Sequence, residues 1–497
     1  MKIFFNFFLF LLMLFGAVPG LAQVKPQIRL FTLPEVVRMA KENSPSYRYT
    51  SVLFENRQWQ YKTFKANFFP QLNLNGYLPE YNKNIVPVLQ PNGSIIPQPN
   101  HSAASALALS LGQEVWFTGG YISINSNINR FDDFIEGSER IPRRYTAVPA
   151  TITFNQPFFG YRWLKWENKV QPLRYEEARR EYWERMEGIA EEATSHFFNL
   201  LLSQISYQIA EKNVSTNQIL YKNAEERFSK GTMPENELLQ IELSLMNSRQ
   251  NLEQTTLDVE ASTLRLKIFL GLTDDDPITL VPPAEIPEFA VDEKFALEQA
   301  HKYRQRMIGF KRELVEADMT MARAKGETGA TASLFASFGL TQQAKNIPDV
   351  YQQLSEQQRL RIGFNIPVMD WGRSDSRLGT AKANLELVKA NVEQQRINFD
   401  QDIYLNVKRF KVLRNQMAVA KRTDEIAEKR YNLTKDRYLD GQISILDLNV
   451  ATEERDKATR SYISALRSFW SAYYNLRHIT LYDFELNKPI ISELSNQ

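Results

Sequence analysis

The sequence predicts an α+β membrane protein made of two structural repeats, in which a few β-strands join unusually long helices. Three observations indicate this: a repeated glycine turn, segments of alternating polar and apolar residues, and long stretches almost without proline or glycine. The turn is written "RFSKGTMPENELL" and again "RYLDGQISILDLN", so that Gly441 follows Gly231 by 210 positions. A shared offset of this kind predicts an internal duplication.

A second pair of segments has the same offset. The segments "ITFNQPFFGYR" and "IGFNIPVMDWGR" place Pro157 and Pro367 210 positions apart. A weaker pair near the starts of the repeats, Ala40 and Ala300, differs by 260. The difference of 50 predicts an insertion at about residues 80–135 of the first repeat, where Pro, Asn and Gly are frequent.

The first 22 residues read as a secretory signal peptide. Lys2 precedes an apolar run that is too short to span a membrane, and the small residues Gly20 and Ala22 precede the expected cleavage site. The absence of cysteine excludes disulfides and thiolate metal sites, and a net charge of +2 does not indicate nucleic acid as a partner. The expected divisions are 1–22 signal peptide, 23–270 first repeat, 271–291 linker, 292–480 second repeat and 481–497 tail.

Long helices are predicted in both repeats. Thr32 is a good N-cap with Glu35 three residues on, so a first helix is expected from there to about residue 67. Further helices are expected at about 163–228, 235–270, 292–325, 376–438 and 444–478. A helix of 66 residues spans about 100 Å, and two helices of about 35 residues end to end match that length. Apolar residues from 458 to 479 alternate spacings of four and three, which is typical of coiled coils.

Four strands are predicted from alternation, around "LNLNGYL", "TITFNQ", "SLFASFGLT" and "LRIGFNI". Two more candidates, "ALALSL" and "YISINSNIN", lie in the insertion, with Gly119 and Gly120 as a hairpin turn between them. The insertion therefore either adds a hairpin to the barrel or forms surface loops. Four to six strands cannot close a membrane barrel, whose minimum is about eight. Several copies must therefore share one barrel, and three copies of four strands make twelve.

The order and spacing of several motifs resemble the TolC-type outer-membrane factor (outer membrane efflux protein) family over essentially the whole mature chain. These motifs are "LPEVVRMAKENSPSY", "FFPQLNLNG", "FNQPFFGYR", "LRLKIFLGL" and the two glycine turns. The resemblance implies a homotrimer with a β-barrel in the lipid of the outer membrane and a helical tunnel in the periplasm. It also implies an equatorial belt formed by residues 271–291 and the tail.

The same resemblance implies a passive exit channel of a tripartite efflux or type I secretion system. The implied partners are a periplasmic adaptor (membrane fusion) protein and an inner-membrane RND or ABC transporter. No cofactor, metal site or enzymatic activity is expected, because the four histidines are scattered and no catalytic motif is present. The alternative is a periplasmic coiled-coil scaffold without transport, which would need strands without a lipid-facing side. The alternation in "LRIGFNI" argues against it.

The residues of interest lie at the two turns. Gly231 and Gly441 are expected to allow a tight reversal between helices. The resemblance implies that these turns form the periplasmic tip, which meets the adaptor. The candidates for adaptor contact are the flanking residues Lys230, Thr232, Asp440 and Gln442.

Three further residues are candidates for the pore aperture. Asp447 lies six residues after Gly441 and, by resemblance, matches an acid that lines the closed aperture in the family. Glu237 is its counterpart in the first repeat, and Tyr438 is a candidate for a latch. The alternative for both acids is that they occupy helix N-termini, where the helix dipole favours them. The chain departs from the family pattern at Ile443 and Val450, in place of a basic residue and a second acid, which leaves the gating details open.

Overall fold

The computed structural model describes residues 29–134, 142–273 and 276–491. The predicted signal peptide lies outside these residues. The first described element is the short strand β1 (Arg29–Phe31), which pairs in parallel with β6 (Ile278–Leu280) in the linker. A second small sheet joins β9 (Tyr482–Asp483) to β10 (Lys488–Pro489).

The helices form two sets with matching bounds. The first set is α2 (Leu33–Asn43), α3 (Pro45–Ala66), α4 (Trp163–Ser229) and α5 (Glu235–Leu270), and the second is α6 (Glu293–Tyr303), α7 (Gln305–Thr328), α8 (Arg373–Leu439) and α9 (Ile445–Thr480). Both ends of α4 and of α5 recur 210 positions later in α8 and α9, and α6 begins 260 positions after α2. The two repeats and both offsets are therefore confirmed.

The predicted single helix at the start of each repeat is wrong, because each is broken into two. The break after α2 falls at Ser44, whose ψ of 152° is extended, as expected for a residue before proline. The break after α6 falls at Arg304, which is also extended although no proline follows. There the backbone N–H of Gln305 donates to the buried carboxylate of Glu184 at 2.5 Å, which satisfies a donor at the new helix start. The capping box of Thr32 and Glu35 is confirmed.

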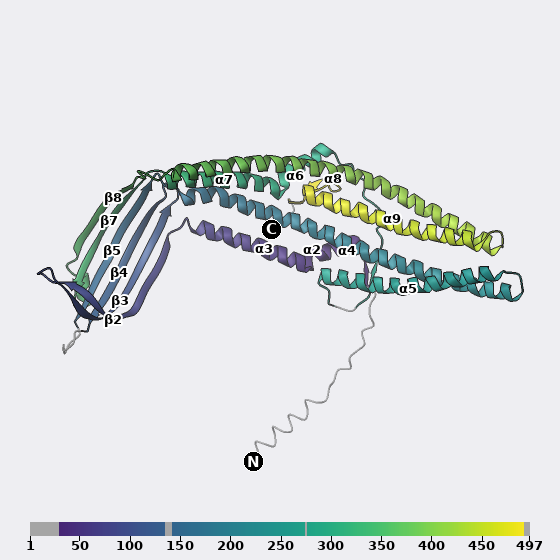
Figure 1. Ribbon diagram of the computed structural model, residues 1–497, viewed down its shortest axis with the longest axis horizontal. Coiled ribbons are helices and arrows are strands. Elements are labelled where there is room, and N and C mark those ends of the chain that lie inside the picture. The colour runs from purple at the N-terminus through teal and green to yellow at the C-terminus, as the bar shows by residue number, and fades with distance from the viewer. Residues whose placement is uncertain (1–28, 135–141, 274–275, 492–497) are drawn as a thin grey trace, which may run out of the picture. The chain divides into compact units, whose positions relative to one another are not determined.

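The main sheet has six strands, so the expectation of about four is corrected and the alternative of six holds. They are β2 (Gln71–Leu89), β3 (Ile95–Val115), β4 (Gly120–Asp133), β5 (Arg143–Phe158), β7 (Thr331–Ala344) and β8 (Ser355–Asn365), and a short 3-10 helix, Pro348–Tyr351, joins the last two. Figure 1 shows them side by side in the order β2-β3-β4-β5-β7-β8. Each neighbouring pair is antiparallel. The described part of the insertion thus forms strands, with Gly119 in the turn at a φ of 75°.

The chain divides into two units. One comprises residues up to 49, 186–290 and 408–478, and contains both glycine turns. The other comprises residues 50–185, 291–407 and 479 onward, and contains the six-stranded sheet. Each unit takes segments from both repeats. Within the described ranges, no helix combines the length and apolar character that crossing a membrane requires.

Candidate functional site

One face of the six-stranded sheet carries large apolar side chains that lie exposed. The register pairs Leu111 with Ile124, Ile124 with Ile152, and Ile152 with Phe338. Directly paired residues lie on the same face of a sheet. We name this set the apolar row: Leu72, Leu74, Leu109, Leu111, Ile122, Ile124, Ile152, Phe338, Leu360 and Ile362. The row crosses all six strands, and its side chains lie exposed in the single chain.

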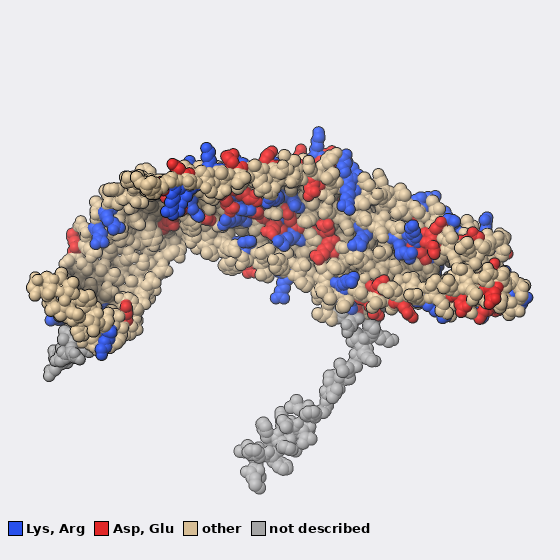
Figure 2. Space-filling model, viewed as in Figure 1, with Lys and Arg blue, Asp and Glu red and all other residues tan. Residues whose placement is uncertain are grey.

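The opposite face of the sheet is polar. Asn73 pairs with Ser110, and Ser110 pairs with Asn125, whose side chain oxygen accepts a hydrogen bond from the Ser110 hydroxyl at 2.6 Å. A second cross-strand contact joins the hydroxyls of Ser123 and Thr153 at 2.5 Å. Figure 2 shows that charged side chains are sparse over the strands and dense over the helices in this view. A sheet with one apolar and one polar face can separate lipid from water.

Aromatic residues gather where the strands join the helices. We name Phe69, Trp116, Phe117, Phe159 and Trp371 the aromatic girdle, since each follows or precedes a strand at this end and each is exposed. Arg162, just before α4, holds one of these segments by donating to the carbonyl of Phe117 at 3.2 Å. Phe159 and Trp371 have φ values of 66° and 58°, which bulky residues rarely adopt. Aromatic residues at such a boundary are typical of membrane interfaces.

The two glycine turns have the same backbone geometry. Gly231 and Gly441 have φ values of 73° and 72°, in the left-handed region. In the first turn the N–H of Gly231 donates to the carbonyl of Phe228 at 2.8 Å. The N–H of Thr232 donates to the carbonyl of Arg227 at 2.9 Å. In the second turn Gly441 and Gln442 make the same two bonds. Each turn is therefore a Schellman motif, in which glycine supplies the positive φ without the cost of a Cβ.

The unit that contains both turns also packs them together. A buried cluster takes Leu220, Ala224, Met233 and Ile241 from the first hairpin of helices and Tyr431, Ile445 and Leu448 from the second. Tyr438 packs against this cluster. The adaptor-contact candidates, Lys230, Thr232, Asp440 and Gln442, are all exposed. The repeated turns thus share one apolar core, and their flanking polar residues face solvent.

The three aperture candidates have different surroundings. Asp447 is exposed, and its Oδ2 accepts from the N–H and the hydroxyl of Ser444 at 3.2 and 2.7 Å, which forms a capping box at the start of α9. Glu237, in the first turn of α5, is half-buried. Burial raises the pKa of the Tyr438 hydroxyl, Arg227 acts to lower it and Glu237 acts to raise it. The charge of Glu237 therefore acts on the Tyr438 hydroxyl, whereas Asp447 caps its own helix.

Sequence reasoning missed a buried charged group near the turns. Arg455 in α9 is only 3% exposed, forms an ion pair with Asp456 at 2.5 Å and lies over the Tyr431 ring at 4.0 Å. Asn213 of α4 hydrogen-bonds both partners of the pair. Three helices are therefore joined at one polar site. The sequence does contain one sign that Arg455 is buried. It lies four residues after Ala451 and three before Ala458, the spacing of core positions in a coiled coil, and both alanines are buried.

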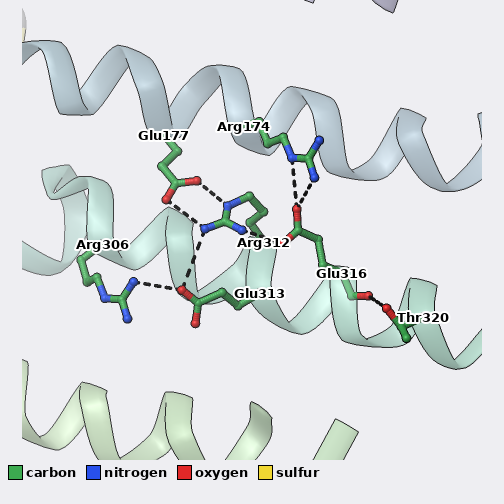
Figure 3. A network of polar contacts seen from close by, with 7 residues as sticks. All are labelled: Arg174, Glu177, Arg306, Arg312, Glu313, Glu316 and Thr320. Carbon is green, nitrogen blue, oxygen red and sulfur yellow. Dashed lines mark hydrogen bonds and ion pairs between the residues drawn. The ribbon is translucent and has the colours of Figure 1, made fainter. Parts of the chain in front are cut away.

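A second polar network joins α4 to α7 in the unit that contains the sheet. Figure 3 shows Arg312 between Glu177 at 2.5 Å and Glu316 at 2.6 Å, with Arg174 on the same Glu316 at 2.7 Å. The hydrogen bond that Arg312 donates to Glu177 raises the pKa of Arg312, which therefore stays charged. A groove of about 500 Å3 lies beside the network, lined partly by Tyr61 and Tyr175. The charges are paired across the two helices, so the network holds α4 against α7.

Residues 318–480 match the model of the outer membrane efflux protein family. No curated protein matches the sequence. The fold is similar to the CmeC outer membrane channel of Campylobacter jejuni, with 15% identity, a TM-score of 0.64 and coverage of 90% of this chain and 85% of that one. It is also similar to the outer membrane protein VceC of Vibrio cholerae, with 13% identity, a TM-score of 0.61 and coverage of 90% and 95%.

A structure of CusC gives similar values, with 15% identity, a TM-score of 0.62 and coverage of 90% of this chain and 91% of that one. At these identities the likeness shows the fold, while the family match rests on the sequence of the second repeat. Residues 318–480 therefore match the outer membrane efflux protein family, and about nine-tenths of the chain shares its fold with the three solved structures.

Proposed function

We propose that this protein is an outer-membrane exit channel, a passive duct formed by three copies that share one β-barrel and one helical tunnel through the periplasm. The observation that carries the proposal is the apolar row, which crosses the whole sheet opposite a polar face. Exposed apolar side chains of this extent are unfavourable in water and favourable in lipid. CmeC, which is described as an outer membrane channel, has the same fold.

The sharing of a barrel follows from the physics of lipid. A sheet in a membrane must close on itself, because open edges leave backbone N–H and C=O groups without partners. The six strands of one chain are fewer than the smallest membrane barrel needs, which is about eight. Copies of the chain therefore pool their strands, and the family resemblance supports three copies. The aromatic girdle would then lie at the periplasmic boundary of the membrane.

The two turns would form the periplasmic end of the duct. Lys230, Thr232, Asp440 and Gln442 are exposed beside left-handed glycines and can contact a periplasmic adaptor protein. The energy for export would come from an inner-membrane transporter of the RND or ABC class, since a passive duct needs no cofactor.

We assign the narrow end of the pore to Asp447, Glu237 and Tyr438. The capping box of α9 occupies only Oδ2 of Asp447, so capping and lining the pore are compatible. Threefold symmetry would turn this exposed carboxylate into a ring of three, which favours cations and repels anions. Glu237, whose charge acts on the Tyr438 hydroxyl, and Tyr438 would support the neighbouring wall.

Two variants separate pore lining from capping. Asp447→Asn removes the charge and keeps the shape, so we expect lower cation selectivity in single-channel recordings. Ser444→Ala removes the cap partner and keeps the charge, so it should lower stability by about 1 kcal/mol and leave selectivity unchanged. Equal selectivity in wild type and Asp447→Asn would remove Asp447 from the aperture.

The test of the channel itself uses the full protein in its native membrane. We expect it in the outer-membrane fraction and, when extracted in mild detergent, as a trimer that runs as an oligomer unheated and as a monomer after heating. The purified trimer should insert into planar lipid bilayers and conduct ions. A water-soluble monomer in the periplasmic fraction would contradict the proposal and favour the scaffold alternative.

A further inference from the structure

The two outer edges of the six-stranded sheet are open. Among the described residues, no strand pairs with the outer edge of β2 or with that of β8. The apolar row nevertheless continues to both edges. Leu72 and Leu74 on β2 and Leu360 and Ile362 on β8 are 64–72% exposed, against 43% for Leu109 on β3. The inner strands have a neighbour on each side, so the extra exposure at the edges corresponds to one missing neighbour.

We propose that the β2 edge of each copy pairs with the β8 edge of the next copy, and that three copies close a barrel of eighteen strands. The number of copies rests on the proposed function, while the six strands of each copy come from the sheet itself. The partner is a second copy of this chain because an open edge is a template for another strand, and both edges carry the same lipid-facing row. Twelve strands, expected from four per chain, are replaced by eighteen.

The strand directions fit this closure. Five antiparallel pairings separate β2 from β8, so these two strands run in opposite directions. Joining β8 of one copy to β2 of the next therefore gives another antiparallel pair, with the hydrogen-bond pattern of the rest of the sheet. An odd number of strands per chain would instead force a parallel pair at each boundary. Six strands per chain avoid this.

The two additional strands lie inside the sheet. The second repeat contributes two strands, β7 and β8, between its helices α7 and α8, whereas the first contributes four between α3 and α4. β3 pairs with β2 along one side and with β4 along the other, and β4 pairs with β5. Removing the β3-β4 hairpin from the wall would break two ladders of backbone hydrogen bonds, the one with β2 and the one with β5. A twelve-stranded barrel is therefore incompatible with the observed register.

The consequence is a wider mouth in the outer membrane. Barrel diameter grows roughly linearly with strand number, so eighteen strands make a barrel about half as wide again as twelve, in the range that leaves an aqueous channel. The wall of this channel would be the polar face of the sheet, with Asn73, Ser110 and Asn125 among its residues. On β8 the same face carries Arg361, whose guanidinium lies 5.6 Å from the Phe335 ring. The channel would thus accommodate bulky hydrated solutes.

Disulfide trapping tests the boundary between copies, because the natural chain has no cysteine. We would combine Asn73→Cys on β2 with a cysteine at Gln357, Arg359, Arg361 or Gly363 on β8, one at a time, since all these positions lie on the polar face. Within one chain five strand spacings separate β2 from β8, about 24 Å, whereas a disulfide needs Cα atoms within about 7 Å. A bond therefore has to join two copies. We expect at least one pair to give a heat-resistant covalent trimer that reducing agent converts to monomer.

The matched control is Ser110→Cys on β3, combined with the same β8 cysteines. Ser110 pairs directly with Asn73 but lies one strand further in, so no cross-link is expected. The eighteen-stranded closure would be overturned if cross-links formed from Ser110 in place of Asn73. It would also be overturned if neither position formed cross-links in a protein that is still trimeric. Both results would leave the channel proposal standing. A protein that forms no trimer at all would contradict the channel proposal itself.

A direct strand count complements the cross-links. A cryo-electron microscopy reconstruction of the wild-type trimer in detergent should resolve eighteen strands around the barrel, six for each copy. A count of twelve would refute the inference even if the trimer conducts ions.

Discussion

The sheet and the paired turns arrange the same kinds of residue in opposite ways. On the sheet, leucine and isoleucine of the apolar row are exposed, and serine, threonine and asparagine line the other face. Around the turns, the apolar residues are buried in the cluster of Leu220 and Ile241, and charged residues face outward. Even a charged pair, Arg455 with Asp456, is buried there. This difference indicates that the two regions suit different solvents: the sheet suits lipid, and the turns suit water.

The largest effect is expected at the buried charged pair of the turn-bearing unit. Asp456→Ala removes the close carboxylate of the buried Arg455 guanidinium and leaves it Glu428 at 4.0 Å, which should lower the free energy of unfolding by about 3–5 kcal/mol. Denaturant or thermal unfolding of the purified trimer measures this. The double variant Arg455→Leu with Asp456→Leu is the control and should lose less stability, because no uncompensated charge remains. Equal losses would mean that the pair is not buried in the assembled protein.

A lysine placed on one face or the other of a single strand tests which face of the sheet contacts lipid. Ile124→Lys places a charge in the middle of the apolar row and should lower stability by about 2–4 kcal/mol, as for a charge near the middle of a bilayer. The next residue faces the other way, so Asn125→Lys should cost less, because it loses only its side-chain hydrogen bonds with Ser110 and Ser123. The fraction of heat-resistant trimer in membranes measures both. Equal sensitivity at the two positions would contradict the assignment of the lipid-facing side.

Two glycines of the same repeat should respond to alanine with opposite signs. Gly441→Ala places a Cβ at a φ of 72°, which should cost about 1–2 kcal/mol although no neighbour blocks the space. Gly379 lies exposed inside α8 with open space around it, so Gly379→Ala should raise stability by up to about 1 kcal/mol. Thermal unfolding of the two variants gives both signs. Destabilisation by Gly379→Ala would indicate that another copy packs against α8 at this point.

The smallest effect is the sensitivity of the wild-type protein to acid that Glu187 contributes; this residue is buried between Lys41 and Arg477 at 2.5 and 3.0 Å. Burial acts to raise the pKa of Glu187, but the two cations outweigh it, so the pKa lies below the ordinary value of 4.5. A lowered pKa in the folded state means that the contribution of this group to stability is complete above pH 4.5 and is lost as the pH falls through the folded pKa. Unfolding of wild type between pH 6 and 3 should show this loss. In Glu187→Gln the dependence on pH in this window should be weaker.

The repeats and the long helices were predictable because their signals are local and regular. The predicted helix at 163–228 differs from α4 by one residue at its end, and the predicted helix at 235–270 coincides with α5. The breaks at Ser44 and Arg304 were missed. At Arg304 the cause is not local, since the new helix start donates to Glu184, a residue more than a hundred positions away.

The candidate site was predictable only in part. The left-handed glycines were expected from the residue type at a helix reversal, and their bond pattern agrees. The electrostatic effect of Glu237 on Tyr438 and the contact of Arg455 with Asn213 join residues more than 200 positions apart. No periodicity in the chain contains that information, because it depends on how one hairpin of helices packs against the other.

The sequence by itself determined the duplication, the lengths of the helices, the polar and apolar sides of the strands and the positions of the turns. Each of these follows from the spacing of residues along one element. Only the tertiary structure decided that the insertion joins the sheet, that the sheet has six strands with two open edges, and that the two turns share one core. The physical reason is that alternation shows which way a side chain points, whereas pairing between strands and packing between helices depend on segments far apart in the chain.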